Sequence, residues 1–323
     1  MPNGKQKHLF ITGGTGFIGR PLVSYFLSRG YFVSCLTRQP DQRSSHPRLR
    51  YVQGDLNNSV VCKVDQPPKL YDAFLHFGAL TARKNGRAAY SCNATGTQNL
   101  INTFSQQLKN TPFIYASSIA VMDDGSFPNT PKKETQEAKA ISLYGQSKLS
   151  GEHILLKASR QFQFHPALLR LTTVYGSGDV RGGISLLIKF IKNYPLPFLV
   201  TPPSQFNFLY VHDIPVICEK IIEKPLTRSK IYILAEKKSH SLAECCQFIS
   251  QTFHKKLRCV TLPKGFWNTL CRFSAGLGFN KLFSFQIRCI TDNVTWCDSS
   301  EITRDYQLEW TSLENGLTHT LKD

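Results

Sequence analysis

The sequence has no uninterrupted apolar run of 18 residues, no CxxC pair and no internal repeat. The first absence argues against a membrane-spanning helix, and the second removes the usual ligand spacing of thiolate metal sites. The N-terminal residues also lack a long apolar signal core. We therefore expect a cytoplasmic protein whose ten cysteines are reduced and mostly buried, and we expect no metal site.

Acidic residues are scarce relative to basic ones, because 39 Lys and Arg face 22 Asp and Glu and give a formal net charge of +17. The basic residues are dispersed and form no long run, so no specific nucleic-acid partner is expected. The excess can steer an anionic substrate or cofactor towards a cleft, and it is compatible with loose association with an acidic membrane surface. A small-molecule substrate is the expected partner, and a homodimer is left open.

Apolar strand-like runs alternate with helix-like segments through the first half of the chain. Such alternation is typical of a parallel sheet that helices cover on both faces. The sequence therefore predicts an α/β fold with a doubly wound parallel sheet. The expected strands are residues 8–12, 31–36, 49–52, 73–77, 112–116 and 167–171, and the expected helices are residues 20–29, 95–108 and 142–160.

Glycine and proline punctuate the chain from about residue 176, for example at Gly176, Gly178 and the pair Pro202 and Pro203. The pattern predicts a smaller, irregular C-terminal lobe. We expect a nucleotide-binding domain over residues 1–175 and a substrate lobe mainly over residues 176–323, partly interleaved with the first domain. Ligands of open α/β sheets bind at the carboxyl ends of the strands, so the lobe should determine substrate specificity.

A glycine-rich segment joins the first expected strand to the first expected helix, with Gly13, Gly16 and Gly19 in a GxxGxxG spacing. Gly13 permits a tight turn, Gly16 lets a pyrophosphate approach the backbone, and Gly19 lets the helix pack on the strand. The helix N-terminus then faces the negative charge of the pyrophosphate. In its strand–turn–helix setting, this spacing predicts a dinucleotide-binding site.

The segment resembles the TGGTGFIG signature of the extended short-chain dehydrogenase/reductase family, the NAD-dependent epimerase/dehydratase group. Similar matches continue through most of the chain, at residues 55–56, 76–79, 93–97, 209–213, 297–300 and 313–317. The resemblance implies a Rossmann domain and an NAD(P)-dependent enzyme. It further implies cofactor contacts at Gly13, Gly16, Phe17, Ile18, Gly19, Asp55, Leu56, Phe77, Gly78, Ala79, Asn93, Tyr144 and Lys148.

The end of the second expected strand carries the signal for the type of nicotinamide cofactor. NAD enzymes of this type place an acidic residue there for the ribose 2′-hydroxyl, whereas NADP enzymes tend to place an Arg nearby for the 2′-phosphate. Here Thr37 stands at the acidic position, Arg38 follows it, and Arg43 adds charge. Because a guanidinium fork suits a phosphate, we favour NADP, with Arg38 as a contact and NAD as the alternative.

Tyr144 and Lys148 form a YxxxK pattern at the start of an expected helix, where the i, i+4 spacing places phenol and ammonium on one face. A nearby ammonium and an oxidised nicotinamide both favour phenolate, so the Tyr144 pKa is expected to fall. Tyr144 can then exchange a proton with a substrate oxygen while hydride moves. In the resembled family, a Ser at the position of Ser118 hydrogen-bonds the same oxygen. The expected catalytic residues are Ser118, Tyr144 and Lys148.

Sugar-nucleotide members of the family usually hold the substrate diphosphate with an Arg shortly before the late strand, and Phe206 stands at that position here. An apolar ring cannot replace a bidentate phosphate contact. Arg181 and Lys189 are candidate substitutes, while Arg170 matches a family Arg that is expected to be structural.

Three hypotheses about function remain. The first is a nucleotide-sugar 4-epimerase or 4-reductase. The second is a reductase or dehydrogenase of an apolar carbonyl or alcohol, such as a sterol-like or flavonol-like compound, which Phe206, Phe208 and Arg38 favour. The third is a non-enzymatic cofactor-binding protein; loss of the Tyr or the Lys would indicate it, and both residues are present.

Overall fold

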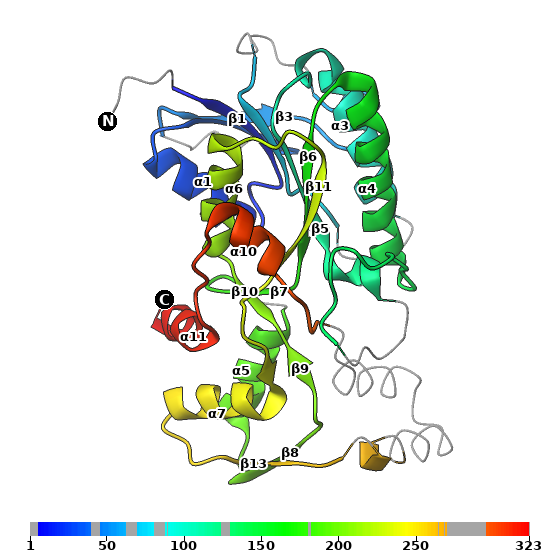
Figure 1. The fold of residues 1–323 in the computed structure, drawn as a ribbon. Coiled ribbons are helices and arrows are strands. Elements are labelled where there is room, and N and C mark those ends of the chain that lie inside the picture. Colours follow the sequence, from blue (N-terminus) through cyan, green and yellow to red (C-terminus); the bar gives the residue numbers. More distant parts are fainter. Residues whose placement is uncertain are drawn as a thin grey trace.

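The computed structural model describes residues 6–39, 46–62, 70–80, 88, 90–123, 130–179, 182–263, 265–267, 269 and 295–322. Its upper part in Figure 1 is a seven-stranded parallel sheet with the order β11-β6-β5-β4-β1-β2-β3. The strands are β1 (His8–Thr12), β2 (Phe32–Thr37), β3 (Leu49–Gln53), β4 (Ala73–His76), β5 (Phe113–Ser118), β6 (Pro166–Leu171) and β11 (Lys230–Leu234). The predicted doubly wound parallel sheet is thereby confirmed.

The strand order reverses at β1, which pairs with β2 on one side and with β4 on the other. A crevice therefore opens at the carboxyl ends of β1 and β4, where ligands of such sheets bind. The central strands β4 and β6 are buried along their whole length. Burial on both faces explains why they are mainly apolar and do not alternate between apolar and polar residues.

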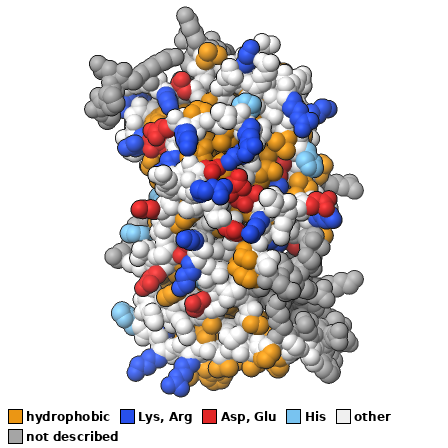
Figure 2. Space-filling model, viewed as in Figure 1, with side chains coloured by type: hydrophobic (Ala, Val, Ile, Leu, Met, Phe, Trp, Pro, Cys, Tyr) orange, Lys and Arg blue, Asp and Glu red, His pale blue; other side chains and the backbone are white. Residues whose placement is uncertain are grey.

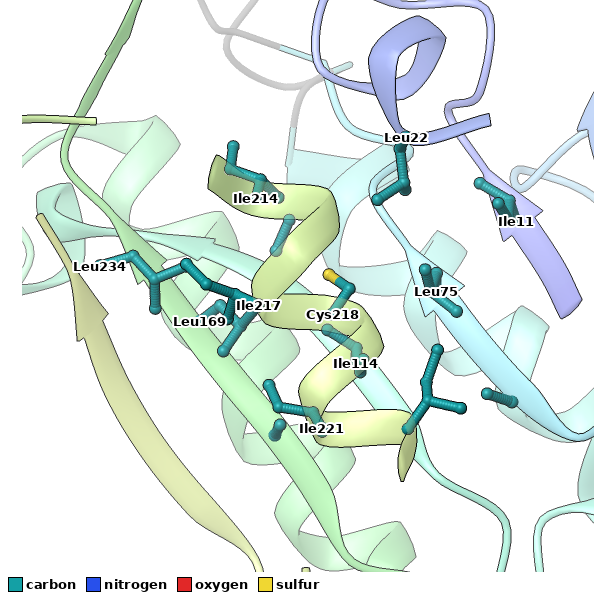
Figure 3. Packing of buried hydrophobic residues seen from close by; sticks show 14 of the residues in the cluster. Ile11, Leu22, Leu75, Ile114, Leu169, Ile214, Ile217, Cys218, Ile221 and Leu234 are labelled. Carbon is teal, nitrogen blue, oxygen red and sulfur yellow. The ribbon is translucent and has the colours of Figure 1, made fainter. Parts of the chain in front are cut away.

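Helices α1 (Gly19–Ser28), α6 (Asp213–Glu223) and α10 (Ser300–Tyr306) cover one face of the sheet, on the left in Figure 1. The labelled side chains of Figure 3, among them Ile217 and Cys218 of α6 and Leu75 of β4, lie in the core between these helices and the strands. Helices α3 (Gly96–Phe104) and α4 (Leu143–Phe162) cover the opposite face. Leu9 faces the first layer and Phe10 the second, as the two-residue period of a strand requires.

Short helical segments adjoin both covering helices of the second face. A π-helical turn, η1 (Ser91–Thr95), leads into α3, a 3₁₀ turn, η2 (Ser105–Gln107), follows it, and a third turn, η3 (Ile119–Met122), follows β5. The expected helix over residues 95–108 is therefore three consecutive segments of different pitch. Strand β11 was not among the expected strands, although its sequence KIYIL is β-branched and aromatic.

The lower part in Figure 1 contains short elements around a separate hydrophobic cluster that includes Ile184, Phe208, Cys245 and Leu313. Three two-stranded sheets pair β7 with β10, β9 with β12 and β8 with β13. The elements are β7 (Thr173–Tyr175), α5 (Gly183–Asn193), β8 (Phe198–Thr201), β9 (Gln205–Phe206), β10 (Phe208–Tyr210), β12 (His240–Ser241), α7 (Leu242–Thr252), β13 (Arg258–Thr261) and α11 (Leu313–Lys322).

Candidate cofactor and catalytic site

A cavity of about 970 Å³ opens at the carboxyl ends of β1, β2 and β4, where the strand order reverses. It runs from the glycine-rich turn to the start of α4 and reaches Leu171 at the end of β6. The predicted residues that line it are Gly13, Gly16, Phe17, Ile18, Gly19, Arg38, Asp55, Leu56, Phe77, Gly78, Ala79, Tyr144 and Lys148. Its size and position suit a dinucleotide.

The glycine-rich turn is packed too closely for side chains. Gly13 adopts a φ of 76°, and a Cβ there would lie 2.6 Å from the backbone nitrogen of Gly78. A Cβ on Gly19 would lie 2.0 Å from the carbonyl oxygen of Gly13. The first turn of α1 contains no acidic residue. Because unpaired amides and the helix dipole both attract anions, this end of α1 can hold a pyrophosphate.

The end of β2 is basic rather than acidic. Arg38 is exposed and lines the cavity, and the Thr37 hydroxyl donates to the carbonyl oxygen of Gln39 at 3.1 Å. Arg43 lies outside the described residues. Across the cavity, the carboxylate of Asp55 accepts from the backbone amide of Asn57 at 2.9 Å. The guanidinium of Arg38 is thus the basic group that the described residues place at the cavity beside the end of β2.

A one-way chain of buried hydrogen bonds supports the loop beneath the cavity. The Gly78 amide donates to Thr12 Oγ1 at 2.9 Å, and Thr12 Oγ1 lies 2.7 Å from His76 Nδ1. On the other side, His76 Nε2 lies 3.0 Å from Thr97 Oγ1, whose proton goes to the Asn93 carbonyl at 2.6 Å. Thr97 must therefore accept from Nε2. Because burial lowers the pKa of His76 to about 3, the ring is neutral and Nδ1 accepts from Thr12.

Asn93, an expected cofactor contact, is buried beside the cavity and is not among its lining residues. Its side-chain oxygen accepts from the Leu80 amide at 2.8 Å. Its side-chain nitrogen donates to the Leu80 carbonyl and to Ser147 Oγ, both at 3.0 Å. The Asn93 side chain therefore holds the loop after β4 against α4.

Tyr144 stands in the first turn of α4, where the Ser142 hydroxyl accepts from the Gly145 amide at 3.0 Å as the N-cap. Ser118 ends β5 and caps η3 by accepting from the Ala120 amide at 3.2 Å. Burial raises the pKa of Tyr144 above its usual value, and a hydrogen bond with Ser118 opposes this effect. The expected fall of the Tyr144 pKa is thus not found in the protein itself, because desolvation of the phenol dominates.

Lys148 is buried one turn further along α4. Its ammonium donates to the Ala116 carbonyl at 2.7 Å and lies 4.8 Å from the centre of the Tyr115 ring. Burial lowers the pKa of Lys148 to about 8, while the nearby Cys92 and Glu152 act in the opposite direction. The side chain keeps a proton at neutral pH and lines the cavity beside Tyr144.

A buried ion pair holds α4 against the sheet, and its acidic partner was not among the residues predicted from the sequence. Arg170 on β6 donates from Nε and Nη2 to the two carboxylate oxygens of Glu152, at 3.0 and 2.7 Å. Ser117 on β5 donates to the same carboxylate at 2.5 Å. The signal available in the sequence is a charged residue four positions after Lys148, on the same face of the helix.

The three positions that the sequence analysis considered for a diphosphate contact belong to the lobe in sequence. Phe206 sits on β9, which pairs with β12, and its ring packs against the hydrophobic cluster of the lobe. Lys189 is exposed on α5, and Arg181 lies outside the described residues. Outside the lobe, Leu80 lines the cavity, and Leu143 directly precedes Tyr144, which also lines it. Both Leu80 and Leu143 are exposed apolar side chains.

The described ranges contain neither a membrane-spanning helix nor a cluster of metal ligands. None of their helices combines the length and the hydropathy that crossing a bilayer requires. Within the same ranges, no three His, Cys, Asp or Glu side chains gather as ligands of a metal ion.

Residues 9–235 match the family model described as the NAD dependent epimerase/dehydratase family. The 3 beta-hydroxysteroid dehydrogenase/Delta 5-->4-isomerase of Mycobacterium tuberculosis is 24% identical over 215 residues, which are 64% of this chain and 57% of that protein. The UDP-glucose 4-epimerase of Vibrio cholerae is 26% identical over 265 residues, which are 80% of this chain and 79% of that enzyme.

Solved structures are similar over nearly the whole chain. MoeE5 in complex with UDP-glucuronic acid and NAD has a TM-score of 0.74, with 21% identity and 98% of both chains covered. The UDP-glucose 4-epimerase of Thermotoga maritima with UDP-glucose also has a TM-score of 0.74, with 16% identity and coverage of 98% and 97%. At this level of identity, these similarities confirm the fold.

The buried His76 predicts a loss of stability in acid. Burial, with a smaller effect of Lys148, lowers the pKa of His76 to about 3. The imidazole takes a proton near pH 6.5 in the unfolded chain, and the folded chain resists protonation down to about pH 3. The neutral imidazole therefore contributes fully to the free energy of unfolding above pH 6.5. This contribution falls by about 1.4 kcal/mol per pH unit as the pH drops below 6.5.

Urea unfolding between pH 7 and pH 4.5 measures this slope. His76→Gln should flatten it by about one proton, whereas His165→Gln, at an exposed position, should leave it unchanged. An unaltered slope in the His76 variant would show that the imidazole is protonated in the folded protein.

Proposed function

This chain belongs to the NAD dependent epimerase/dehydratase family and is an enzyme, and we propose that it transfers a hydride between a bound nicotinamide and a substrate carbinol or carbonyl. One observation carries the proposal. The glycine-rich turn, Tyr144 and Lys148 line one cavity together, and Ser118, at the end of β5, acts on the pKa of Tyr144.

The three side chains have distinct tasks in this proposal. Since burial keeps Tyr144 protonated at neutral pH, its phenol can donate a proton to a substrate carbonyl as hydride arrives from the nicotinamide. Ser118 holds the same substrate oxygen. Lys148, still charged at neutral pH, stabilises the phenolate that results. The bound nicotinamide supplies only the hydride.

The glycine-rich turn and the start of α1 would hold the pyrophosphate of the cofactor. Asp55 and Leu56 would contact the adenine, and Phe77, Gly78 and Ala79 would lie beneath the nucleotide. NAD is named in MoeE5 and in other structures that are similar in fold. For this chain we propose NADP, because Arg38 lines the cavity at the end of β2 and Thr37 replaces an acidic residue.

A nucleotide sugar is the first substrate class that we propose, with epimerisation or reduction at its 4-position. The support is the similarity to UDP-glucose 4-epimerase, which extends over 80% of this chain and therefore includes much of the lobe. The carbonyl that Tyr144 and Ser118 can hold is compatible with a 4-keto sugar.

An apolar alcohol or ketone is the second class, and a specific observation favours it. Phe206 packs into the hydrophobic cluster of the lobe and offers no contact to a diphosphate. Leu80 lines the same cavity as Tyr144 and Leu143 directly precedes Tyr144, and both are exposed apolar side chains. Steroid dehydrogenases are also among the relatives, although the M. tuberculosis enzyme is matched over only 57% of its length.

We also propose that residues 1–175 form the cofactor domain and residues 176–323 mainly the substrate lobe. The interleaving is supported by α6, β11 and α10, which come from the second range and pack on the sheet. A cytoplasmic location is proposed from the cysteines of the described residues, all of which are free thiols and, except Cys259, buried. The homodimer stays a prediction that no contact in the structure tests.

Tyr144→Phe should lower turnover by a factor on the order of 10² or more and leave cofactor affinity nearly unchanged, because it removes the exchanged proton and little else. Steady-state kinetics and calorimetric cofactor titration measure the two effects. Tyr90→Phe is the control, since the Tyr90 hydroxyl lies 3.0 Å from Ser150 Oγ on an exposed part of the surface. Unchanged turnover in the Tyr144 variant would refute the proposed mechanism.

NADPH should bind more tightly than NADH, and Arg38→Ala should weaken NADPH alone, because only NADPH carries the 2′-phosphate. A lost charged hydrogen bond of this kind costs about 1.5–3 kcal/mol, or roughly ten- to a hundredfold in affinity. Arg50→Ala is the control, since this exposed residue lies towards the amino end of β3, away from the cavity. Equal affinity of the wild-type protein for both cofactors would contradict the assignment.

Titration with free UDP separates the two substrate classes. Because Phe206 leaves the diphosphate without its usual guanidinium, we expect binding weaker by about ten- to a hundredfold than a bidentate contact would give. The intrinsic tryptophan signal follows the titration. Micromolar affinity would favour a nucleotide sugar, and no binding at millimolar UDP would favour an apolar alcohol or ketone.

A further inference from the structure

The far end of the lobe presents an apolar sheet face that no described element covers. Strands β8 and β13 pair in parallel, with Phe198 opposite Arg258 and Val200 opposite Val260. Phe198, Val200 and Val260 are 52%, 37% and 50% exposed. The alternate residues Leu199 and Cys259 pack inward on the lobe's hydrophobic cluster. The outer side of this pair, which we call the β8–β13 face, is therefore apolar and accessible.

Further apolar side chains adjoin the face. Leu196 precedes β8 and is 48% exposed, and Phe266 follows β13 and is 50% exposed. The amide of Leu262 donates to the Thr201 carbonyl at 3.0 Å, which continues the pairing of the two strands towards Phe266. Single exposed apolar residues are common, but a contiguous group at one end of a molecule marks an interaction surface.

The charged residues in the segments that form the β8–β13 face have one sign. Arg258 lies on the face itself, and Lys256 and Lys192 are exposed beside the two strands. In the sequence, no Asp or Glu occurs between Asp179 and Asp213 or between Glu244 and Asp292. Figure 2 shows hydrophobic side chains next to Lys and Arg side chains at this lower end of the molecule.

We propose that the β8–β13 face binds the surface of an anionic lipid membrane. Apolar side chains can enter the boundary between headgroups and acyl chains while the surrounding Lys and Arg side chains contact anionic headgroups. A second copy of the chain fits this face poorly, because an isologous contact would bring two sets of cations together and the segments that form the face contain no acidic residue to pair with them. A nucleic acid would use the cations and leave Phe198, Val200 and Val260 without a partner.

The proposal does not depend on the substrate of the enzyme. It places the far end of the lobe on the bilayer, while the cofactor cavity lies at the opposite side of the lobe, at the edge of the sheet. The small number of apolar side chains predicts peripheral, reversible binding that salt weakens.

Cosedimentation with vesicles tests the electrostatic part. The wild-type protein should bind vesicles containing roughly a third phosphatidylglycerol and should not bind pure phosphatidylcholine vesicles. The double substitution K256E/R258E should lower the partition coefficient at least tenfold. K109E/R160E is the matched control, because it changes the net charge equally at two exposed positions next to the sheet. Equal losses in both variants would show that only net charge matters and would overturn the proposal.

The apolar part needs a second pair of variants. F198S/V260S should weaken vesicle binding, whereas V60S/L70S, at exposed positions elsewhere, should not. Lipids brominated on their acyl chains should quench the emission of Trp267, whose ring lies 5.6 Å from that of Phe266, and Trp267→Phe should abolish this quenching. If F198S/V260S instead lowers the melting temperature and leaves vesicle binding intact, the chain itself covers the face and the proposal is wrong.

Discussion

The buried ion pair between Glu152 and Arg170 joins the fold of this enzyme to its candidate site. Both side chains are nearly inaccessible, at 1% and 3% exposure, and Ser117 adds a third contact to the carboxylate. Removing one partner of such a pair leaves an uncompensated charge that costs about 3–5 kcal/mol. Because α4, β5 and β6 meet at this point, the helix that carries Tyr144 and Lys148 has one position on the sheet.

The loop beneath the cavity is fixed by a different principle. Its hydrogen bonds run in one direction from Gly78 through Thr12, His76 and Thr97 to the backbone of Asn93. Each donor in this series of hydrogen bonds finds an acceptor. A fully satisfied buried network is rigid, whereas one missing partner would leave a costly unpaired group. The neutral His76 therefore gives the loop beneath the cavity a geometry that exists before any ligand binds, which lowers the entropic cost of binding.

Short-range signals in the sequence predicted the glycine-rich turn and the YxxxK helix correctly as elements, because their geometry depends on residues only a few positions apart. The role of Glu152 and the hydrogen bonds of His76 were not predicted, because their partners Arg170, Thr12 and Thr97 lie on other strands and helices. The pKa of Tyr144 likewise depends on contacts that the sequence spacing does not show. Sequence spacing brings an ammonium near Tyr144, but burial of the phenol decides the direction of the shift, and burial is a property of the assembled fold. Strand β11 was missed because it lies in a half of the chain that glycine and proline interrupt.

The cations near the β8–β13 face come from two segments that are far apart in the sequence and are brought together by strand pairing. Along the sequence, the cations are dispersed, and the excess of +17 indicates no particular surface. Pairing of β8 with β13 brings together two segments some sixty residues apart, each from a stretch without acidic residues. Alternation along both strands then sends Phe198, Val200, Arg258 and Val260 to one side. The apolar and basic β8–β13 face follows from strand register rather than from any local run of charge, so no basic run in the sequence marks it.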